Sequence, residues 1–318
     1  MGKQPPPPPP THPPSRAEIT EALRLAGYAL EIRAGRVLID LGFGTTHGER
    51  YPTHHDGTHN DVDLTAIQFA DVKGSHRQIV RLVLLAAVKQ YVPGAAFVAF
   101  PPHRLMKQDG RVRLGGVPSY YVRDNAEWDR ALEPLLLGIM RALAPLRHAS
   151  TSCVQYAVAQ YKNKGGNEYA AYASHEQGTE DDLQQLMAAQ ASVYLSETHR
   201  ALGVPQLAPL PVMFFVVPAL VLNCPVYTFT ERTGRLKKER WVSLELTRDV
   251  PAPKSTSVVD VVSFAHLKTY AKHLLSVLAG VAADAHQKKG ALAEAAEMQR
   301  AHWARGATAN TTLPQLGR

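Results

Sequence analysis

A chain of 318 residues, 45% of them apolar and 20% charged, has room for a sizeable core and the composition of a globular protein. No run of about 18 apolar residues occurs, so no membrane span is expected, and the start MGKQPPPPPP lacks the apolar region of a signal peptide. The net charge of +7, with an isoelectric point near 9.4, is compatible with a polyanionic partner without specifying one. Two cysteines make neither a disulfide framework nor a zinc site, and they fit a cytoplasmic protein.

The first half of the chain alternates helices with strand-like runs. Residues 1–14 are expected to form a disordered, proline-rich tail. Ser15 and Glu18 have the spacing of a capping box and predict a helix start. A second helix follows, with an apolar stripe from Leu30 to Leu41 and a stop at Gly42. Strands are predicted over residues 43–51, 61–69, 79–92 and 93–102, and then a helix over about 125–148.

The second half contains further strands and two long helices. A strand is predicted over residues 150–161, and a helix over 179–203 with Thr179 as its cap and acids near its start, as the helix dipole favours. Strands over 211–232, 234–250 and 255–264 precede a closing helix over 264–287. The buried-looking Asp260 requires a polar partner.

The resulting fold class is α+β with an α/β-like core, a central mixed sheet flanked by helices. The expected organisation is a core over 15–150, an α+β distal half over 151–289 that is packed on the core or continuous with it, and an alanine-rich, partly disordered tail over 290–318.

Acids and a lysine stand at the ends of neighbouring predicted strands. Because side chains alternate along a strand, Asp61 and Asp63 share one face, and Ala87 and Lys89 share one face of the next strand. Glu31 lies on the preceding helix, one turn before a glycine. Phosphodiester hydrolysis requires a cation that polarises the phosphate and activates water, and Mg²⁺ prefers carboxylate oxygens. The pattern therefore suggests a metal-dependent phosphodiesterase site.

The arrangement resembles the PD-(D/E)xK, or restriction-endonuclease-like, superfamily over about residues 28–101. Glu31 matches the helix glutamate, Asp63 the metal-binding aspartate and Lys89 the lysine, and Asp61 takes the place of the acid two residues before the key aspartate. The resemblance implies a Mg²⁺- or Mn²⁺-dependent endonuclease that cuts DNA in defence against foreign DNA. In that reading the catalytic residues are Asp63, Lys89 and Glu31, and the metal ligands are Asp63, Asp61 and Glu31.

The chain departs from this family at position 87, where Ala87 replaces the acid expected two residues before the lysine. Three readings stay open. Asp61 compensates for the missing carboxylate, or the working half-motif is Asp71 to Lys73, or the chain is a catalytically inactive module that binds nucleic acid or a protein partner. A purely structural protein is favoured if Asp63 and Lys89 face apart.

Two basic stretches are candidate contacts for nucleic acid, and each has a plainer interpretation. Lys162 and Lys164 lie in QYKNKGGNEY, which is also an ordinary glycine-containing turn. Lys237, Lys238 and Arg240 lie beside a tryptophan in KKERW, a pattern that suits phosphate contacts but is also typical of a solvated hairpin. If nucleic acid lies across the site, these residues are expected to flank it.

Overall fold

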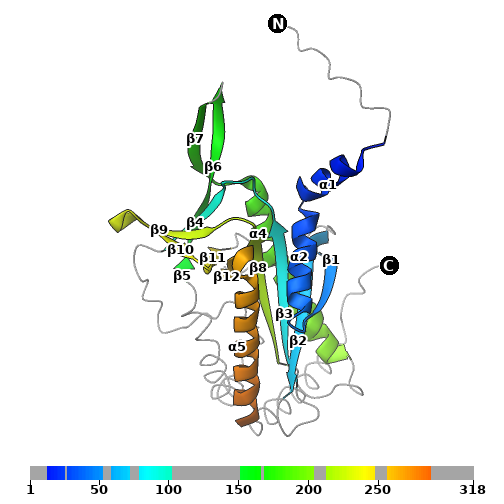
Figure 1. The fold of residues 1–318 in the computed structure, drawn as a ribbon. Helices are drawn as coiled ribbons and strands as arrows, with labels where there is room; N and C mark the ends of the chain where they lie inside the picture. The colour runs from blue at the N-terminus through cyan, green and yellow to red at the C-terminus, as the bar shows by residue number, and fades with distance from the viewer. Residues whose placement is uncertain are drawn as a thin grey trace, which may run out of the picture.

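The computed structural model describes residues 13–25, 27–52, 59–71, 79–101, 151–165, 168–203, 213–247 and 256–287, which form an α+β fold (Figure 1). The helices are α1 (Arg16–Leu25), α2 (Tyr28–Ile39), α4 (Gln177–Gly203) and α5 (Leu267–Gln287), with 3₁₀ turns η1 (Glu231–Thr233) and η2 (Phe264–His266). The strands are β1 (Gly44–Pro52), β2 (His59–Asp71), β3 (Ile79–Lys89), β4 (Ala96–Phe100), β5 (Thr151–Cys153), β6 (Gln155–Gly165), β7 (Glu168–Ser174), β8 (Met213–Leu222), β9 (Val226–Thr230), β10 (Arg235–Glu239), β11 (Trp241–Thr247) and β12 (Thr256–Ser263).

These strands form two sheets. The larger has the order β1-β2-β3-β8-β12-β11-β5, and the smaller has the order β10-β9-β4-β6-β7. In the larger sheet β2 pairs antiparallel with β1 and β3, whereas β3 pairs parallel with β8, from Val80 opposite Met213 to Lys89 opposite Leu222. The central sheet is therefore mixed, and it draws its strands from both halves of the chain.

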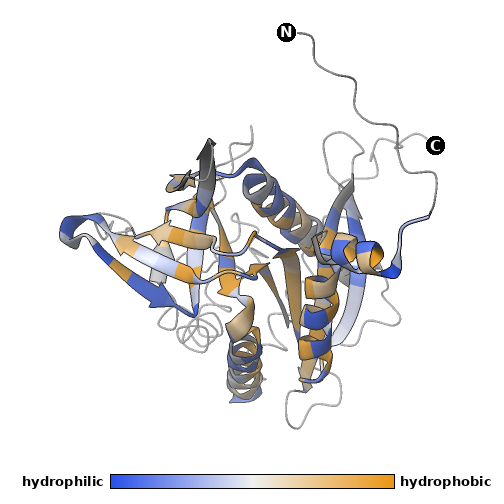
Figure 2. Cartoon of the chain, turned by 45° about the horizontal axis from the view of Figure 1, so that its top comes forward, coloured by the Kyte–Doolittle hydropathy of each residue, from blue (hydrophilic) through white to orange (hydrophobic). Residues whose placement is uncertain are grey.

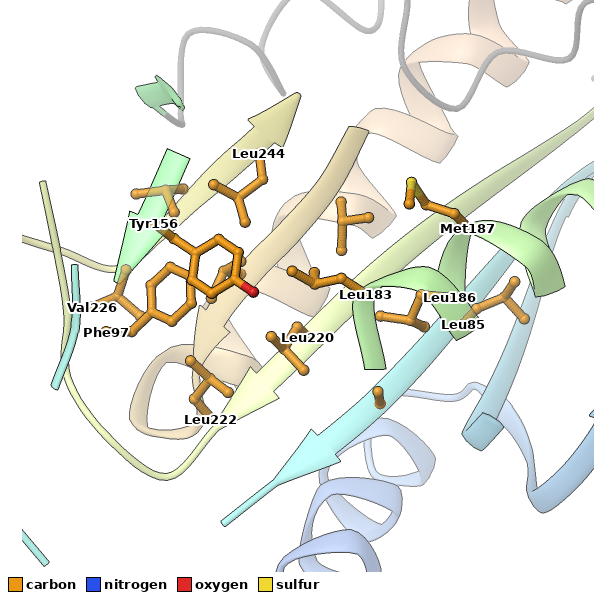
Figure 3. Close-up of a cluster of buried hydrophobic side chains, with 14 of the residues drawn as sticks. Leu85, Phe97, Tyr156, Leu183, Leu186, Met187, Leu220, Leu222, Val226 and Leu244 are labelled. Carbon is orange, nitrogen blue, oxygen red and sulfur yellow. The ribbon is translucent and has the colours of Figure 1, made fainter. Parts of the chain in front are cut away.

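The larger sheet is covered on both faces. On one face α2 and α5 pack over Leu64, Leu84 and Ala86. On the other face α4 and the smaller sheet enclose a second apolar cluster (Figure 3). In this cluster the α4 side chains Leu183, Leu186 and Met187 lie near Leu85 and Leu220. Phe97 stacks on Tyr156 in the same cluster, with ring centroids 5.3 Å apart. Burial on both faces explains why β3 and β8 read as nearly continuous apolar runs.

The local signals at the first two helices are confirmed. Ser15 and Glu18 form the capping box: the Ser15 backbone N–H donates to Glu18 at 2.7 Å, and the Glu18 N–H donates to Ser15 Oγ at 3.3 Å. Leu30, Ala34 and Leu38 are buried, with Val37 and Leu41 partly buried beside them. Gly42 follows α2 with a φ of 89°, a conformation that favours glycine.

Four of the predicted elements were wrong in detail. The run 211–232 divides after Leu222 into β8, which belongs to the larger sheet, and β9, which belongs to the smaller sheet. The run 150–161 divides at Val154 into β5, which pairs with β11 in the larger sheet, and β6, which belongs to the smaller sheet. The run 234–250 likewise divides at Arg240 into β10 and β11, one in each sheet. Helix α4 begins at Gln177, so Thr179 is inside its first turn rather than at its cap.

Several predictions lie outside the described residues: the helix over 125–148, the tail over 290–318 and all but the last residues of the tail over 1–14. Within the described residues, none of the helices is long and apolar enough to cross a bilayer.

Candidate functional site

Asp63 lies at the point on β2 where the pairing with β3 ends. The pairing of these strands runs from Asp71 opposite Ile79 to Leu64 opposite Ala86. At the next residue of β2, Asp63 Oδ2 accepts a hydrogen bond from the Val88 backbone N–H at 2.6 Å. A side-chain carboxylate thus takes the place of a backbone acceptor, which fixes Asp63 against the end of β3.

Lys89 ends β3 and turns towards α4. Its Nζ lies 3.1 Å from Asp182 Oδ2 and 3.4 Å from Glu176 Oε2, and its side chain is 18% exposed. Because Ala87 precedes Lys89 by two residues, the two share the face of β3 that packs on α4, where Ala87 lies in one cluster with Leu183 and Leu186. Lys89 therefore ends β3, and Asp63, a residue inside β2, lies beside that end, where the pairing of the two strands stops.

Asp182 is the acid that the sequence reading missed. The helix dipole explains acids at the start of α4 in general, but Asp182 also bonds to Lys89 and is repelled by Asp63. The signal in the sequence that it faces the sheet is its position four residues before Leu186, a buried residue of α4. Asp182 of α4 and Glu176, which directly precedes the helix, are thus carboxylates that lie against the end of β3 at Lys89.

Glu31 and His47 complete the surroundings of Asp63. Glu31 of α2 is near enough for the two carboxylates to repel each other, and the His47 imidazole attracts the Asp63 charge. His47 reaches this place because Gly35 has no side chain: a Cβ at Gly35 would lie 2.8 Å from His47 Nε2. The glycine of α2 does allow a close approach, but the approaching group is this histidine.

The other two acids of the sequence hypotheses lie apart from this centre. Asp61 is 62% exposed and forms an ion pair with Arg50 at 3.3 Å, so it reaches Asp63 only through electrostatic repulsion. Asp71 lies at the opposite end of β2, exposed, and about 26 Å from Asp63 along the strand at 3.3 Å per residue. Lys73, the other half of that alternative motif, lies outside the described residues.

Burial and like charges raise the pKa values of three carboxyl groups at the site. For Asp63 the main cause is burial, offset in part by the Val88 N–H. For Asp182 burial again raises the pKa, the Lys89 ammonium lowers it, and Asp63 and Glu176 raise it further. The pKa of Glu31 is raised by burial and by Asp63. A divalent cation between Asp63 and Asp182 would relieve this repulsion.

A site for Mg²⁺ or Mn²⁺ here would have few protein ligands. Within the described part of the chain, no three histidine, cysteine or acidic side chains gather closely enough to enclose a metal ion. Two carboxylates are nonetheless a usual number for Mg²⁺, which retains several waters and takes further oxygens from a bound phosphate.

The basic candidates lie on two strands of the smaller sheet, β10 at one edge and β6 next to the strand at the other edge. Lys237 and Lys238 lie on β10, where Lys237 pairs with Glu239 at 2.9 Å and the exposed strand gives its hairpin with β9 a hydrophilic surface (Figure 2). Arg240 is exposed beside them. Lys162 and Lys164 lie on β6, in the hairpin that projects beside the start of α4 (Figure 1), although their side chains are outside the described set. Two strands, β9 and β4, therefore separate the strands that carry the two groups.

Comparison with protein-family models, curated proteins and solved structures found no match.

Proposed function

We propose that this protein is a metal-dependent nuclease-like protein whose site for phosphodiester hydrolysis lies where β2, β3 and α4 meet. The observation that carries the proposal is that Asp63 of β2 bonds to the end of β3, next to Lys89, with Asp182 bonded to Lys89 and electrostatically coupled to Asp63. The resemblance of Glu31, Asp63 and Lys89 to the PD-(D/E)xK pattern supports the same chemistry, and Asp182 replaces the acid that Ala87 lacks.

In this proposal Asp63 and Asp182 hold Mg²⁺ or Mn²⁺, with Glu31 assisting. The cation, when bound, polarises the phosphate and lowers the pKa of water. Lys89 donates to the attacking water and offsets the negative charge that develops on the phosphate oxygens. The Val88 N–H keeps Asp63 in place, and the apolar cluster below α4 keeps water from the buried side of the site.

DNA is the proposed substrate, in a role that fits defence against foreign DNA, and the cytoplasm is the proposed compartment. The net charge of +7 favours association with a polyanion, and the exposed basic residues of β10 supply phosphate contacts away from the cluster of acids. A second candidate function rests on Ala87 and on the occupation of Lys89 by two acids: a nuclease-like module that binds nucleic acid or a protein partner without cutting it.

The experiment that tests the proposal incubates the purified chain with supercoiled plasmid, single-stranded DNA and RNA, each with Mg²⁺, Mn²⁺ or a chelator. Cleavage should require the metal and should fall about 10²-fold or more in Asp63→Asn and in Lys89→Met, because each removes a charged group from the reacting centre. Asp71→Asn is the matched control, since it removes an exposed carboxylate from the other end of the same strand.

Two results would contradict the proposal. Cleavage that persists in Asp63→Asn and disappears in Asp71→Asn would move the site to the other half-motif. An absence of metal-dependent cleavage, together with binding of DNA that weakens steeply with salt, would favour the binding module.

A further inference from the structure

The ammonium of Lys89 lies in an electrostatically unfavourable place, against the first turn of α4. A Cβ added to Gly178 would lie 2.6 Å from Lys89 Nζ, so the lysine approaches the helix backbone closely only because residue 178 is glycine. The N-terminus of a helix carries a partial positive charge, which repels a cation. Negative groups must therefore hold Lys89 there.

Glu176 is the better anchored of its two acidic partners. The Glu176 carbonyl accepts the backbone N–H groups of Thr179 and Glu180 at 3.0 and 3.2 Å, which fixes it at the start of the first turn of α4. Its carboxylate accepts the hydroxyl of Thr179, and the Thr179 hydroxyl is in turn hydrogen-bonded to that of Tyr91. Thr179 and Tyr91 are both buried, so this chain of hydrogen bonds is shielded from water.

The contacts close into a ring. Tyr91 follows Lys89 by two residues, and the backbone N–H of Tyr91 donates to Asn223 Oδ1 at 2.6 Å while the side-chain amide of Asn223 donates back to the Tyr91 carbonyl at 2.9 Å. The segment that leaves β3 thus provides both the cation and the tyrosine that orients its partner. Lys89, Glu176, Thr179 and Tyr91 form one unit between β3 and α4.

Asp182 is anchored differently, because Asp63 repels it while Lys89 attracts it. An Asp182 that holds a cation together with Asp63 has less negative charge left for Lys89, whereas Glu176 keeps its contact with the lysine. We propose that Glu176 is the positioning residue of Lys89, oriented by Thr179 and Tyr91, and that Gly178 provides the space for the ammonium. The catalytic importance of this arrangement rests on the proposed function, but the arrangement itself can be tested without any activity.

The test measures how fast Lys89 is acetylated in the native full-length chain by a small amine-reactive reagent, with quantification of the Lys89 peptide by mass spectrometry. Glu176→Gln should speed the labelling of Lys89 about tenfold, as expected for the loss of one charge-assisted contact at a part-buried site. Gly178→Ala should do the same without removing a charge, because its methyl displaces Nζ. It also replaces a helical glycine with a better helix former, so it remains informative if Glu176→Gln weakens the helix.

Two matched variants separate orientation from general loosening. Thr179→Val removes the hydroxyl that orients Glu176 and should give an intermediate increase, whereas Thr179→Ser keeps the hydroxyl and should restore slow labelling. Asp181→Asn removes a neighbouring exposed acid that bonds to Gln177, and it should leave the labelling of Lys89 unchanged.

Unchanged labelling in both Glu176→Gln and Gly178→Ala would overturn the inference, and so would an equal increase in Asp181→Asn. If the unaltered chain cuts DNA, Glu176→Gln should lower kcat with little change in KM. If the labelling pattern holds while the unaltered chain cuts no nucleic acid, the positioning of Lys89 stands and the proposed function fails.

Discussion

Replacing Asp63 by asparagine should stabilise the metal-free protein while it removes activity. The amide keeps an oxygen that can accept the Val88 N–H, so the hydrogen bond at the end of β3 survives. What disappears is a partly buried negative charge that interacts unfavourably with the carboxylates of Glu31, Asp61 and Asp182. Removing several such repulsions at a part-buried site should raise the free energy of unfolding by about 1 to 2 kcal/mol at neutral pH.

The pH dependence of this gain follows from the raised pKa of Asp63. Because burial raises the pKa of Asp63 in the folded state above its ordinary value, the folded protein holds that proton more tightly than the unfolded chain does. The contribution of protonated Asp63 to stability is complete at pH values below the pKa of Asp63 in the unfolded chain. It is lost as the pH rises through the pKa of Asp63 in the folded protein. The advantage of Asp63→Asn should therefore be small in acid and should grow towards neutral pH.

Thermal unfolding followed by circular dichroism, at about pH 4 and pH 8 with a chelator and then with Mn²⁺, measures this effect. At about pH 8 the metal-free variant should melt roughly 2 to 8 °C above the unaltered chain, and Mn²⁺ should narrow that difference by stabilising only the unaltered chain. A variant that melts lower than the unaltered chain at both pH values, or that gains as much from Mn²⁺, would refute the reasoning.

Three further outcomes are expected. Ala87→Glu should raise metal-dependent cleavage. Because residue 87 is only 7% exposed, the same change should lower the free energy of unfolding of the metal-free protein by about 3 to 5 kcal/mol in chemical denaturation. In the Ala87→Glu background, cleavage should survive the further change Asp182→Ala, because the new glutamate replaces the Asp182 carboxylate. Tyr270→Phe removes one of the two hydroxyls, each 2.6 Å away, that donate to Asp260, and it should lower the free energy of unfolding in urea by about 1 to 3 kcal/mol. Lys238→Ser should weaken DNA binding and reduce the slope of log affinity against log salt by about 1 in a titration series.

Short-range signals in the sequence were sufficient for parts of the fold. The capping box at Ser15 and the stop at Gly42 involve residues a few positions apart, so their physics is contained in the local sequence. The divisions at Val154 and Arg240 were missed because each separates strands that join different sheets, and that choice depends on partners distant in sequence. Asp260 clearly required partners, but Ser243 and Tyr270 are identified only by the packing of β11 and α5 on β12.

Part of the candidate site could also be predicted from local patterns in the sequence. Alternation along β3 places Ala87 and Lys89 on one face, and the antiparallel pairing of β2 with β3 brings Asp63 to that end. Asp182 could not be recognised, because an acid in the first turns of a helix fits the helix dipole equally well. Its role depends on α4 lying over the end of β3, a contact between segments 93 residues apart.

The most direct test of the account is the affinity for a divalent cation, measured by titration calorimetry of Mn²⁺ into the chain and into Asp63→Asn, Asp182→Asn and Asp71→Asn. The account predicts that the unaltered chain and Asp71→Asn bind Mn²⁺ with the same affinity. It also predicts that Asp63→Asn and Asp182→Asn each lose most of that affinity, because each removes one of the two carboxylates proposed to hold the ion. Undiminished binding by both of these variants would contradict it.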